Sequence, residues 1–304
     1  MSPLSDQNPF STARPPAGTG DDVLTVRGLD VVYQVETPVH AVRDVSFTLR
    51  RGEILGLAGE SGCGKTTLVY AINQLHRPPA KVTDGSIVFH DRDGEDIDLL
   101  ALRGERLRQF RWSKLSMVFQ GAMNALNPVL TAGAQLDDVL RTHMPQMKRR
   151  ERRERCAEVF RLVGVDPSRL RAFPHELSGG MRQRVIIAMA LLLQPQVIIM
   201  DEPTTALDVV IQREILREIM RLRDEFGFAV IFITHDLPLL LEISDRIAIM
   251  LRGEIVEHGN AETVYHRPEH EYTQKLLSSF PSLTGSRDSF VGGPRAYPDE
   301  VPRS

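Results

Sequence analysis

The sequence predicts an α/β fold with a mainly parallel sheet and an antiparallel β subdomain ahead of it. Short apolar runs at residues 54–58, 197–200 and 229–234 alternate with helical patterns such as residues 211–226. Buried parallel strands have such apolar runs, and alternation of strands with helices is typical of a parallel sheet. Residues 23–49 instead alternate apolar and polar side chains, as half-exposed antiparallel strands do.

Composition excludes several classes of protein. The chain has 304 residues, a formal net charge of -3 and a pI near 6.3, whereas a dedicated nucleic-acid binder is strongly basic. The longest apolar run, residues 185–193, is too short to cross a bilayer, and no signal peptide opens the chain, so we expect no membrane-spanning segment. Two cysteines, Cys63 and Cys156, form no disulfide framework, which favours a reducing cytoplasm.

The first alternating strands follow a segment without periodicity. Residues 1–22 contain Pro, Ser, Gly and Asp, and we expect a disordered leader there. Tyr33 lies in the second alternating run. A flat aromatic ring can stack on adenine, but an ordinary strand tyrosine packed on its neighbours would look the same.

A glycine-rich motif for phosphate binding follows the first apolar run. Residues 59–66 match G-x-x-x-x-G-K-[ST], the P-loop motif. Glycines leave backbone N–H groups free to surround phosphates, Lys65 can reach the outer phosphates, and the Thr66 hydroxyl can ligate Mg²⁺. The strand before the motif and the helical pattern after it predict a P-loop NTPase rather than a glycine-rich turn without a ligand.

The middle of the chain adds strands and a charged helix. Residues 86–89 and 115–119 have strand patterns, and residues 99–110 between them look helical. After Gln120 the chain changes character and includes the charged run K-R-R-E-R-R-E-R at 148–155. Arginine and glutamate are interleaved there, which favours a solvated helix face over a nucleic-acid patch.

Two carboxylates follow the second apolar strand. Asp201 and Glu202 come directly after residues 197–200. A carboxylate at the carboxyl end of a buried strand beside a P-loop can hold magnesium, and an adjacent glutamate can polarise water. A helix cap would explain one of the two acids. The lone His235, after strand 229–234, would by itself be a satisfied polar group at a strand end.

The remaining patterns close the fold. Residues 247–250 and 254–257, separated by R-G, predict a hairpin, and residues 271–280 predict a helix. Residues 281–304 return to Pro, Gly and Ser, so we expect a flexible tail.

The order of these motifs resembles that of the ATPase subunits of ABC transporters. The motifs are the P-loop, Gln120, L-S-G-G-M at 177–181, V-I-I-M-D-E at 197–202 and His235. The L-S-G-G signature is peculiar to ABC ATPases, whereas many unrelated proteins share a P-loop. The resemblance implies ATP and Mg²⁺ as ligands, a RecA-like parallel core, and one ATPase domain at residues 23–280 with a helical insert at about 121–185.

The resemblance also implies a role for each matching residue. Tyr33 would stack on adenine, Gln120 would sense magnesium and the attacking water, and Asp201 would support magnesium. Glu202 would be the general base, and His235 would contact the γ-phosphate. The residues holding the phosphates and the metal would be Gly59, Ser61, Gly62, Cys63, Gly64, Lys65, Thr66 and Thr67.

In this family two subunits pair head to tail, and each completes the other's site. Ser178, Gly179 and Gly180 would contact the γ-phosphate of an ATP held by the opposite subunit, and Asp208 in T-A-L-D would belong to a loop that communicates across the interface. Closure on ATP and release on hydrolysis would then drive a pore in other chains.

Further motifs resemble the oligopeptide and dipeptide importers. They include V-H-A-V-R-D-V-S-F, A-L-N-P-V, F-P-H-E-L-S-G-G-M-R-Q-R and Y-T-Q-K-L-L-S. The expected partners are a second, homologous ATPase, two transmembrane permease subunits and an extracytoplasmic solute-binding protein, with this chain on the cytoplasmic face of the cell membrane. Two features differ from relatives. Many relatives have an acidic residue and proline after the glutamine, where this chain has Gly121, Ala122 and Met123. Some relatives bind an iron–sulfur cluster through C-terminal cysteines, but no cysteine follows Cys156 here.

Other cargoes and classes remain open from sequence. Relatives of this kind also import oligosaccharides such as β-glucosides, nickel or other small solutes. ABC ATPases acting on DNA carry a long coiled coil, and those acting on ribosomes usually carry two cassettes. One cassette with about 110 residues between P-loop and signature favours transport, and the Y-T-Q-K-L-L segment favours import over export.

Overall fold

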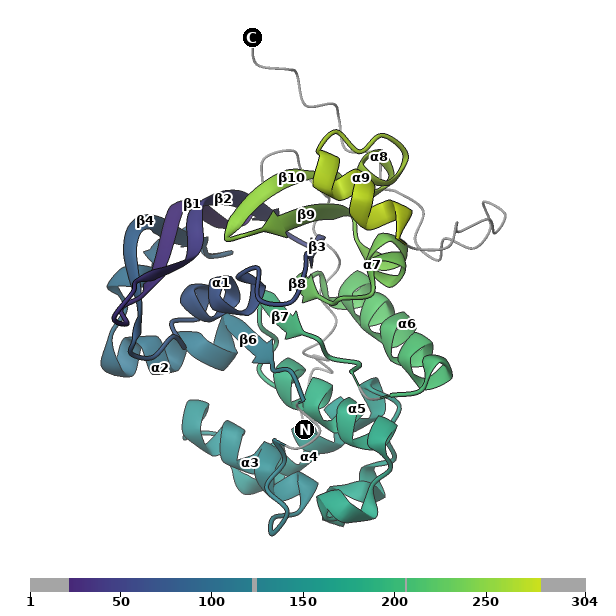
Figure 1. The fold of residues 1–304 in the computed structure, drawn as a ribbon. Helices are drawn as coiled ribbons and strands as arrows, with labels where there is room; N and C mark the ends of the chain where they lie inside the picture. Colours follow the sequence, from purple (N-terminus) through teal and green to yellow (C-terminus); the bar gives the residue numbers. More distant parts are fainter. Residues whose placement is uncertain (1–21, 122–124, 206, 280–304) are drawn as a thin grey trace.

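The computed structural model describes residues 22–121, 125–205 and 207–279, which form two sheets with helices around them (Figure 1). Within these ranges, no helix combines the length and apolar composition needed to cross a bilayer. The predicted tail at 281–304 lies outside the described residues. So does the predicted leader at 1–22, except for Asp22, which already belongs to a strand.

An antiparallel sheet lies in the part of the molecule drawn in purple and blue in Figure 1. Its strands are β1 (Asp22–Tyr33), β2 (Val39–Arg50), β4 (Ala80–His90) and β5 (Asp96–Asp98), in the order β2-β1-β4-β5. The alternating residues 23–49 thus form antiparallel strands, as predicted, but the first two alternating runs, up to Tyr33, belong to the single strand β1. β4 is much longer than the predicted 86–89, because its polar first half pairs with β1 through the backbone.

A six-stranded, mainly parallel sheet forms the centre. Its strands are β3 (Ile54–Ala58), β6 (Leu115–Val118), β7 (Val197–Asp201), β8 (Ala229–Ile233), β9 (Arg246–Leu251) and β10 (Glu254–Asn260). Their order is β10-β9-β3-β8-β7-β6, and only β10 runs antiparallel to its neighbour. The α/β fold is therefore confirmed, together with the closing hairpin.

Helices cover this sheet and extend beyond its β6 edge. They are α1 (Lys65–Ile72), α2 (Gly104–Ser113), α3 (Ala132–His143), α4 (Arg149–Leu162), α5 (Gly179–Leu191), α6 (Val209–Phe226), α7 (Leu237–Ile243), α8 (Ala261–His266) and α9 (Glu271–Ser278). Short 3-10 turns are η1 (Leu99–Ala101), η3 (Pro167–Arg171) and η4 (Pro174–Glu176). The predicted single helix at 99–110 is wrong: η1 ends at Ala101, and extended backbone at Leu102 and Arg103 separates it from α2.

Two apolar clusters sandwich the parallel sheet. Successive side chains of a strand point to opposite faces, and β8 shows this directly. Its Val230 and Phe232 join the cluster with α5 and α6, whereas Ala229 and Ile231 join the cluster with α1 and the antiparallel sheet. Burial on both faces explains the uninterrupted apolar runs in the sequence. In Figure 1, α3, α4 and α5 lie together in the lower part, with the antiparallel sheet above.

Candidate active site

The candidate residues converge because their strands are neighbours. β3, β8, β7 and β6 lie side by side and run in parallel, so their carboxyl ends share one edge of the sheet. Ligands of open α/β sheets bind at this edge. The glycine loop follows β3, Asp201 ends β7, and His235 and Gln120 follow β8 and β6 shortly after those strands end.

The glycine loop has a shape that side chains would prevent. Gly59 and Gly64 have φ angles of 147° and 113°, values that L residues rarely adopt. A Cβ on Gly59 would lie 2.3 Å from the carbonyl oxygen of Met250, and one on Gly64 would lie 2.1 Å from that of Ala41. The loop is therefore packed directly against β9 and β2, and its backbone amides are not screened by side chains.

The first turn of α1 has the features of an anion-binding site. Its N-cap is Gly64, and no side chain caps the first N–H groups. Unsatisfied N–H groups at a helix start attract phosphate, as does the positive end of the helix dipole. Lys65 is buried, and its ammonium group donates to the carbonyl oxygens of Gly59 at 2.7 Å and Glu60 at 2.8 Å. The Lys65 side chain thus lies against the glycine loop, where it would contact a bound phosphate.

Asp201 and Thr66 form a candidate metal site. The Asp201 side chain is 1% exposed, and its Oδ2 atom has no hydrogen-bond partner. Burial raises the pKa of Asp201, the Thr66 hydrogen bond lowers it, and the Glu202 charge raises it again. A buried carboxylate oxygen without a partner, beside a hydroxyl, suits Mg²⁺, which prefers oxygen ligands. In the described ranges no three His, Cys, Asp or Glu side chains cluster as a metal site.

Glu202 is held by three neighbouring side chains. Its Oε2 atom accepts from Gln120 Nε2 at 2.9 Å and from Thr205 Oγ1 at 3.0 Å, and its Oε1 atom lies 3.4 Å from His235 Nδ1. The φ angle of Glu202 is 47°, which is rare for a residue with a side chain and costs backbone strain. The strained backbone and these contacts fix the carboxylate beside Asp201, where it can accept a proton from a bound water.

Tyr33 lies at the end of β1, close to the glycine-loop helix. Its hydroxyl is 3.2 Å from Thr67 Oγ1, and its ring is partly exposed. The hydrogen bond ties the antiparallel sheet to α1. The partial exposure of Tyr33 is compatible with stacking on a base, which stays a prediction.

The signature residues and Asp208 make local contacts in this chain. Ser178 Oγ accepts from Met181 N at 3.3 Å and caps α5, and Asp208 Oδ1 accepts from Ile211 N at 2.9 Å and caps α6. In the described part of the chain, no hydrogen bond or ion pair joins residues 178–180 to the glycine loop. Their role across an interface with a second chain stays a prediction.

Two site residues have no counterpart among the sequence predictions. Thr205 donates to Glu202, and Tyr272 of α9 accepts a hydrogen bond from Glu60 N in the glycine loop at 3.1 Å. Thr205 stands in D-E-P-T-T, close enough to Glu202 to have been considered. Tyr272 is separated from the loop by about two hundred residues, and no spacing rule connects them.

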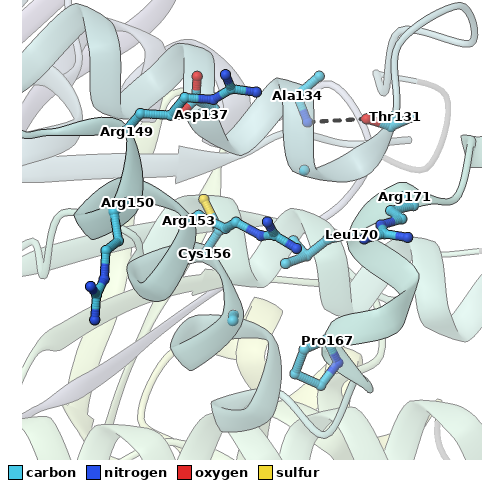
Figure 2. A pocket seen from close by; sticks show the side chains of 12 residues that line it. Thr131, Ala134, Asp137, Arg149, Arg150, Arg153, Cys156, Pro167, Leu170 and Arg171 are labelled. Carbon is cyan, nitrogen blue, oxygen red and sulfur yellow. Dashed lines mark hydrogen bonds between the residues drawn. The ribbon is translucent and has the colours of Figure 1, made fainter.

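A second hollow lies away from the glycine loop, in the helical part of the chain (Figure 2). Its volume is about 850 Å³, and α3, α4 and η3 form its walls. Figure 2 shows Arg153 and Arg171 directed toward Leu170 from opposite sides. Cys156 also lines it, and burial raises the pKa of this thiol to about 12, so the thiol stays protonated and unreactive.

Two protein families match the sequence. The family described as "ABC transporter" matches residues 42–205, and the family "Oligopeptide/dipeptide transporter, C-terminal region" matches residues 256–302.

Individual relatives agree with these matches. The dipeptide transport ATP-binding protein DppD of Bacillus subtilis is 43% identical over 267 residues, covering 86% of this chain and 78% of DppD. The glutathione import ATP-binding protein GsiA of Salmonella choleraesuis is 43% identical over 284 residues, covering 91% of this chain but only 45% of GsiA. The chain thus spans less than half of GsiA.

Solved structures share the fold. The dimeric bacterial ABC transporter cassette MJ0796 superposes with a TM-score of 0.68 at 29% identity, covering 78% of this chain and 98% of that cassette. A post-hydrolysis state of the same cassette, dimeric and bound to ADP and Pi, gives a TM-score of 0.67 at 28% identity, with the same coverage.

Proposed function

The chain belongs to the ABC transporter family as an ATP-binding cassette, and from that premise we propose that it hydrolyses ATP to drive a binding-protein-dependent importer of oligopeptides or dipeptides. The observation that carries the proposal is the meeting of the glycine loop, the unpartnered Asp201 oxygen and the braced Glu202 carboxylate at one sheet edge. Phosphoryl transfer to water needs charge neutralisation and a positioned nucleophile, and these groups supply both.

The residues of this chain divide the chemistry between them. The loop amides and Lys65 bind the phosphates, while Glu202, held by Gln120 and Thr205, orients a water and takes its proton. Mg²⁺, when bound at Thr66 and Asp201, would neutralise phosphate charge. His235, whose side chain is 71% exposed, can turn from Glu202 toward the γ-phosphate.

A second ATPase subunit would complete the site. Ser178, Gly179 and Gly180 lie at the N-terminus of α5, where free N–H groups favour an anion. Within the described residues no hydrogen bond or ion pair joins them to the loop of their own chain, and we assign them to the ATP of a partner. The partner is a homologous chain or a second copy.

The helical part of the chain would contact the permease subunits. Val129, Leu130 and Phe173 expose large apolar side chains there, and a hydrogen bond from Ala132 N to Ala172 O joins their two segments. Contiguous exposed apolar groups mark protein contacts. The arginines around the hollow of Figure 2 add positive charge to the same helical part. A contact of this kind would hold the chain at the cytoplasmic face of the membrane, which is part of the proposal.

The cargo follows from relatives and not from the site. The names of DppD and GsiA give a dipeptide and glutathione as their cargoes, both of them short peptides. The C-terminal family match points the same way. Oligosaccharide import by the same architecture is the alternative, and cargo is selected by chains other than this one.

Co-purification from membranes tests these assignments. We expect two permease subunits, a second ATPase, and ATP turnover that rises when a peptide-loaded binding protein is added. Stimulation by a sugar-loaded binding protein instead would refute the peptide cargo, while the assignment of the chain to an importer would stand. Recovery without any membrane subunit would refute the transport assignment.

A further inference from the structure

The start of α9 is fixed by its own hydrogen bonds. The Glu257 carboxylate of β10 accepts from the backbone N–H groups of Glu269 at 2.9 Å and His270 at 3.0 Å. His270 Nδ1 in turn accepts from Tyr272 N at 3.1 Å and caps the helix, and Thr273 is fully buried. These contacts leave Tyr272 with little freedom to move.

From this position Tyr272 reaches the glycine loop. Its hydroxyl oxygen accepts from Glu60 N at 3.1 Å, and the ring packs at the margin of the apolar cluster that includes Val264. Burial raises the pKa of Tyr272, so the hydroxyl is neutral at physiological pH. The carbonyl oxygen of Glu60 accepts from the Lys65 ammonium at 2.8 Å. A single residue of the loop is thus held by α9 through its N–H and by the lysine through its carbonyl.

The neighbouring hairpin holds the loop at a second point. Gly253, in the turn between β9 and β10, donates its N–H to the Cys63 carbonyl at 2.9 Å. A cavity of about 440 Å³ separates the two attachments and is lined by residues 60–63 and by residues of α9. The side of the loop that faces α9 is therefore supported at Glu60 and at Cys63, with open space between.

We propose that Tyr272 is a positioning residue of the nucleotide site, through which the C-terminal segment 257–278 keeps the glycine loop in its phosphate-binding shape. A loop built around glycines at positive φ loses much conformational freedom when it is ordered. An external hydrogen bond at Glu60 supplies part of that order before nucleotide arrives, and preorganisation of this kind raises affinity. The inference rests on the proposed binding of ATP by this loop. It gives a function to the described part of the C-terminal family match, residues 256–279.

The test compares Tyr272→Phe with Tyr265→Phe in the full-length chain. Phenylalanine keeps the ring of Tyr272 and removes only the hydroxyl that meets Glu60. Tyr265 lies in α8 on the same apolar cluster, and its ring pairs with His266, so it controls for the loss of a hydroxyl in this region. Binding of a fluorescent ATP analogue, amide hydrogen exchange over residues 59–65 and the melting temperature without nucleotide are measured for each protein.

We expect Tyr272→Phe to bind the analogue about three- to tenfold more weakly, the factor for loss of one neutral hydrogen bond. Exchange in the loop should become faster, while the melting temperature and all values for Tyr265→Phe stay close to those of the unmodified chain. In ATPase assays KM should rise, with kcat changed by less than about twofold, because the loop binds phosphates in the ground state and the transition state alike. Unchanged affinity and exchange in Tyr272→Phe would overturn the inference alone. An unmodified chain that binds no nucleotide would overturn it together with the proposed function.

Discussion

Replacement of Glu202 by glutamine isolates the proposed general base. The amide has nearly the same shape as the carboxylate, and an oxygen at the position of Oε2 can still accept from Gln120 and Thr205. The amide nitrogen would then face His235. The substitution therefore removes a charge and a proton acceptor while most local contacts remain.

The expected magnitude follows from this geometry. A positioned general base contributes about 10²- to 10⁴-fold to a rate. We therefore expect kcat to fall by this factor, which corresponds to a rise of about 3–5 kcal/mol in the activation free energy. ATP binding should persist, because the glycine loop and Lys65 are unchanged. The Glu202 charge raises the pKa of Asp201, so its removal should favour the ionised aspartate that a metal needs. Bound but uncleaved ATP should accumulate and hold the two ATPase subunits together.

Phosphate release by the purified complex measures the rate, and gel filtration with ATP measures subunit association. Glu225→Gln is a matched control, since Glu225 is an exposed glutamate of α6 that pairs with Arg221 on the surface, and such pairs contribute little to stability. Turnover of Glu202→Gln at the rate of the control would remove Glu202 from the role of general base.

Three other outcomes are expected. Gly64→Ala should lower the melting temperature well beyond Gly94→Ala, because both glycines have positive φ but only Gly64 lies against a backbone carbonyl; equal effects in calorimetry would contradict the packing. The pKa of the Asp201 carboxyl is higher in the folded chain than the unfolded value of 3.8, so the protonated carboxyl favours the folded state. This contribution to the free energy of unfolding is complete below pH 3.8 and is lost as the pH rises through the pKa of the folded chain. Asp201→Asn should flatten that loss in melting curves at several pH values, and an unchanged slope would speak against it. Cys63, near the Lys65 ammonium, should be alkylated before Cys156, whose raised pKa keeps it protonated. Mass spectrometry reads the order of labelling, and labelling of Cys156 first would contradict it.

Elements with strong local patterns were predictable from sequence. Both faces of the parallel sheet are buried, so β3, β7 and β8 appear as apolar runs, and Asp201 was placed correctly at a strand end. The first half of β4 was not predicted, because Ala80–Gly85 includes exposed polar residues and is held by backbone pairing to β1. Backbone hydrogen bonds leave little trace in side-chain pattern.

The site residues that belong to motifs were also predictable, whereas those that depend on tertiary contacts were not. Glu202 and Gln120 were identified through motif order, and the structure brings them within 2.9 Å. Tyr272 was missed because its contact with Glu60 depends on how the last helix folds back over the sheet edge. The N-cap role of Asp208 could have been predicted, because this aspartate directly precedes an amphipathic helix. Its role across an interface stays a prediction, since it involves a second chain.

The proposed function is tested most directly by ATP turnover of the complete complex in lipid membranes, with and without a peptide-loaded binding protein. We expect turnover that rises with the loaded binding protein and that falls by about 10²-fold or more when this chain carries Glu202→Gln. Turnover that neither responds to the binding protein nor depends on Glu202 would contradict the assignment of this chain as the hydrolysing subunit of a peptide importer.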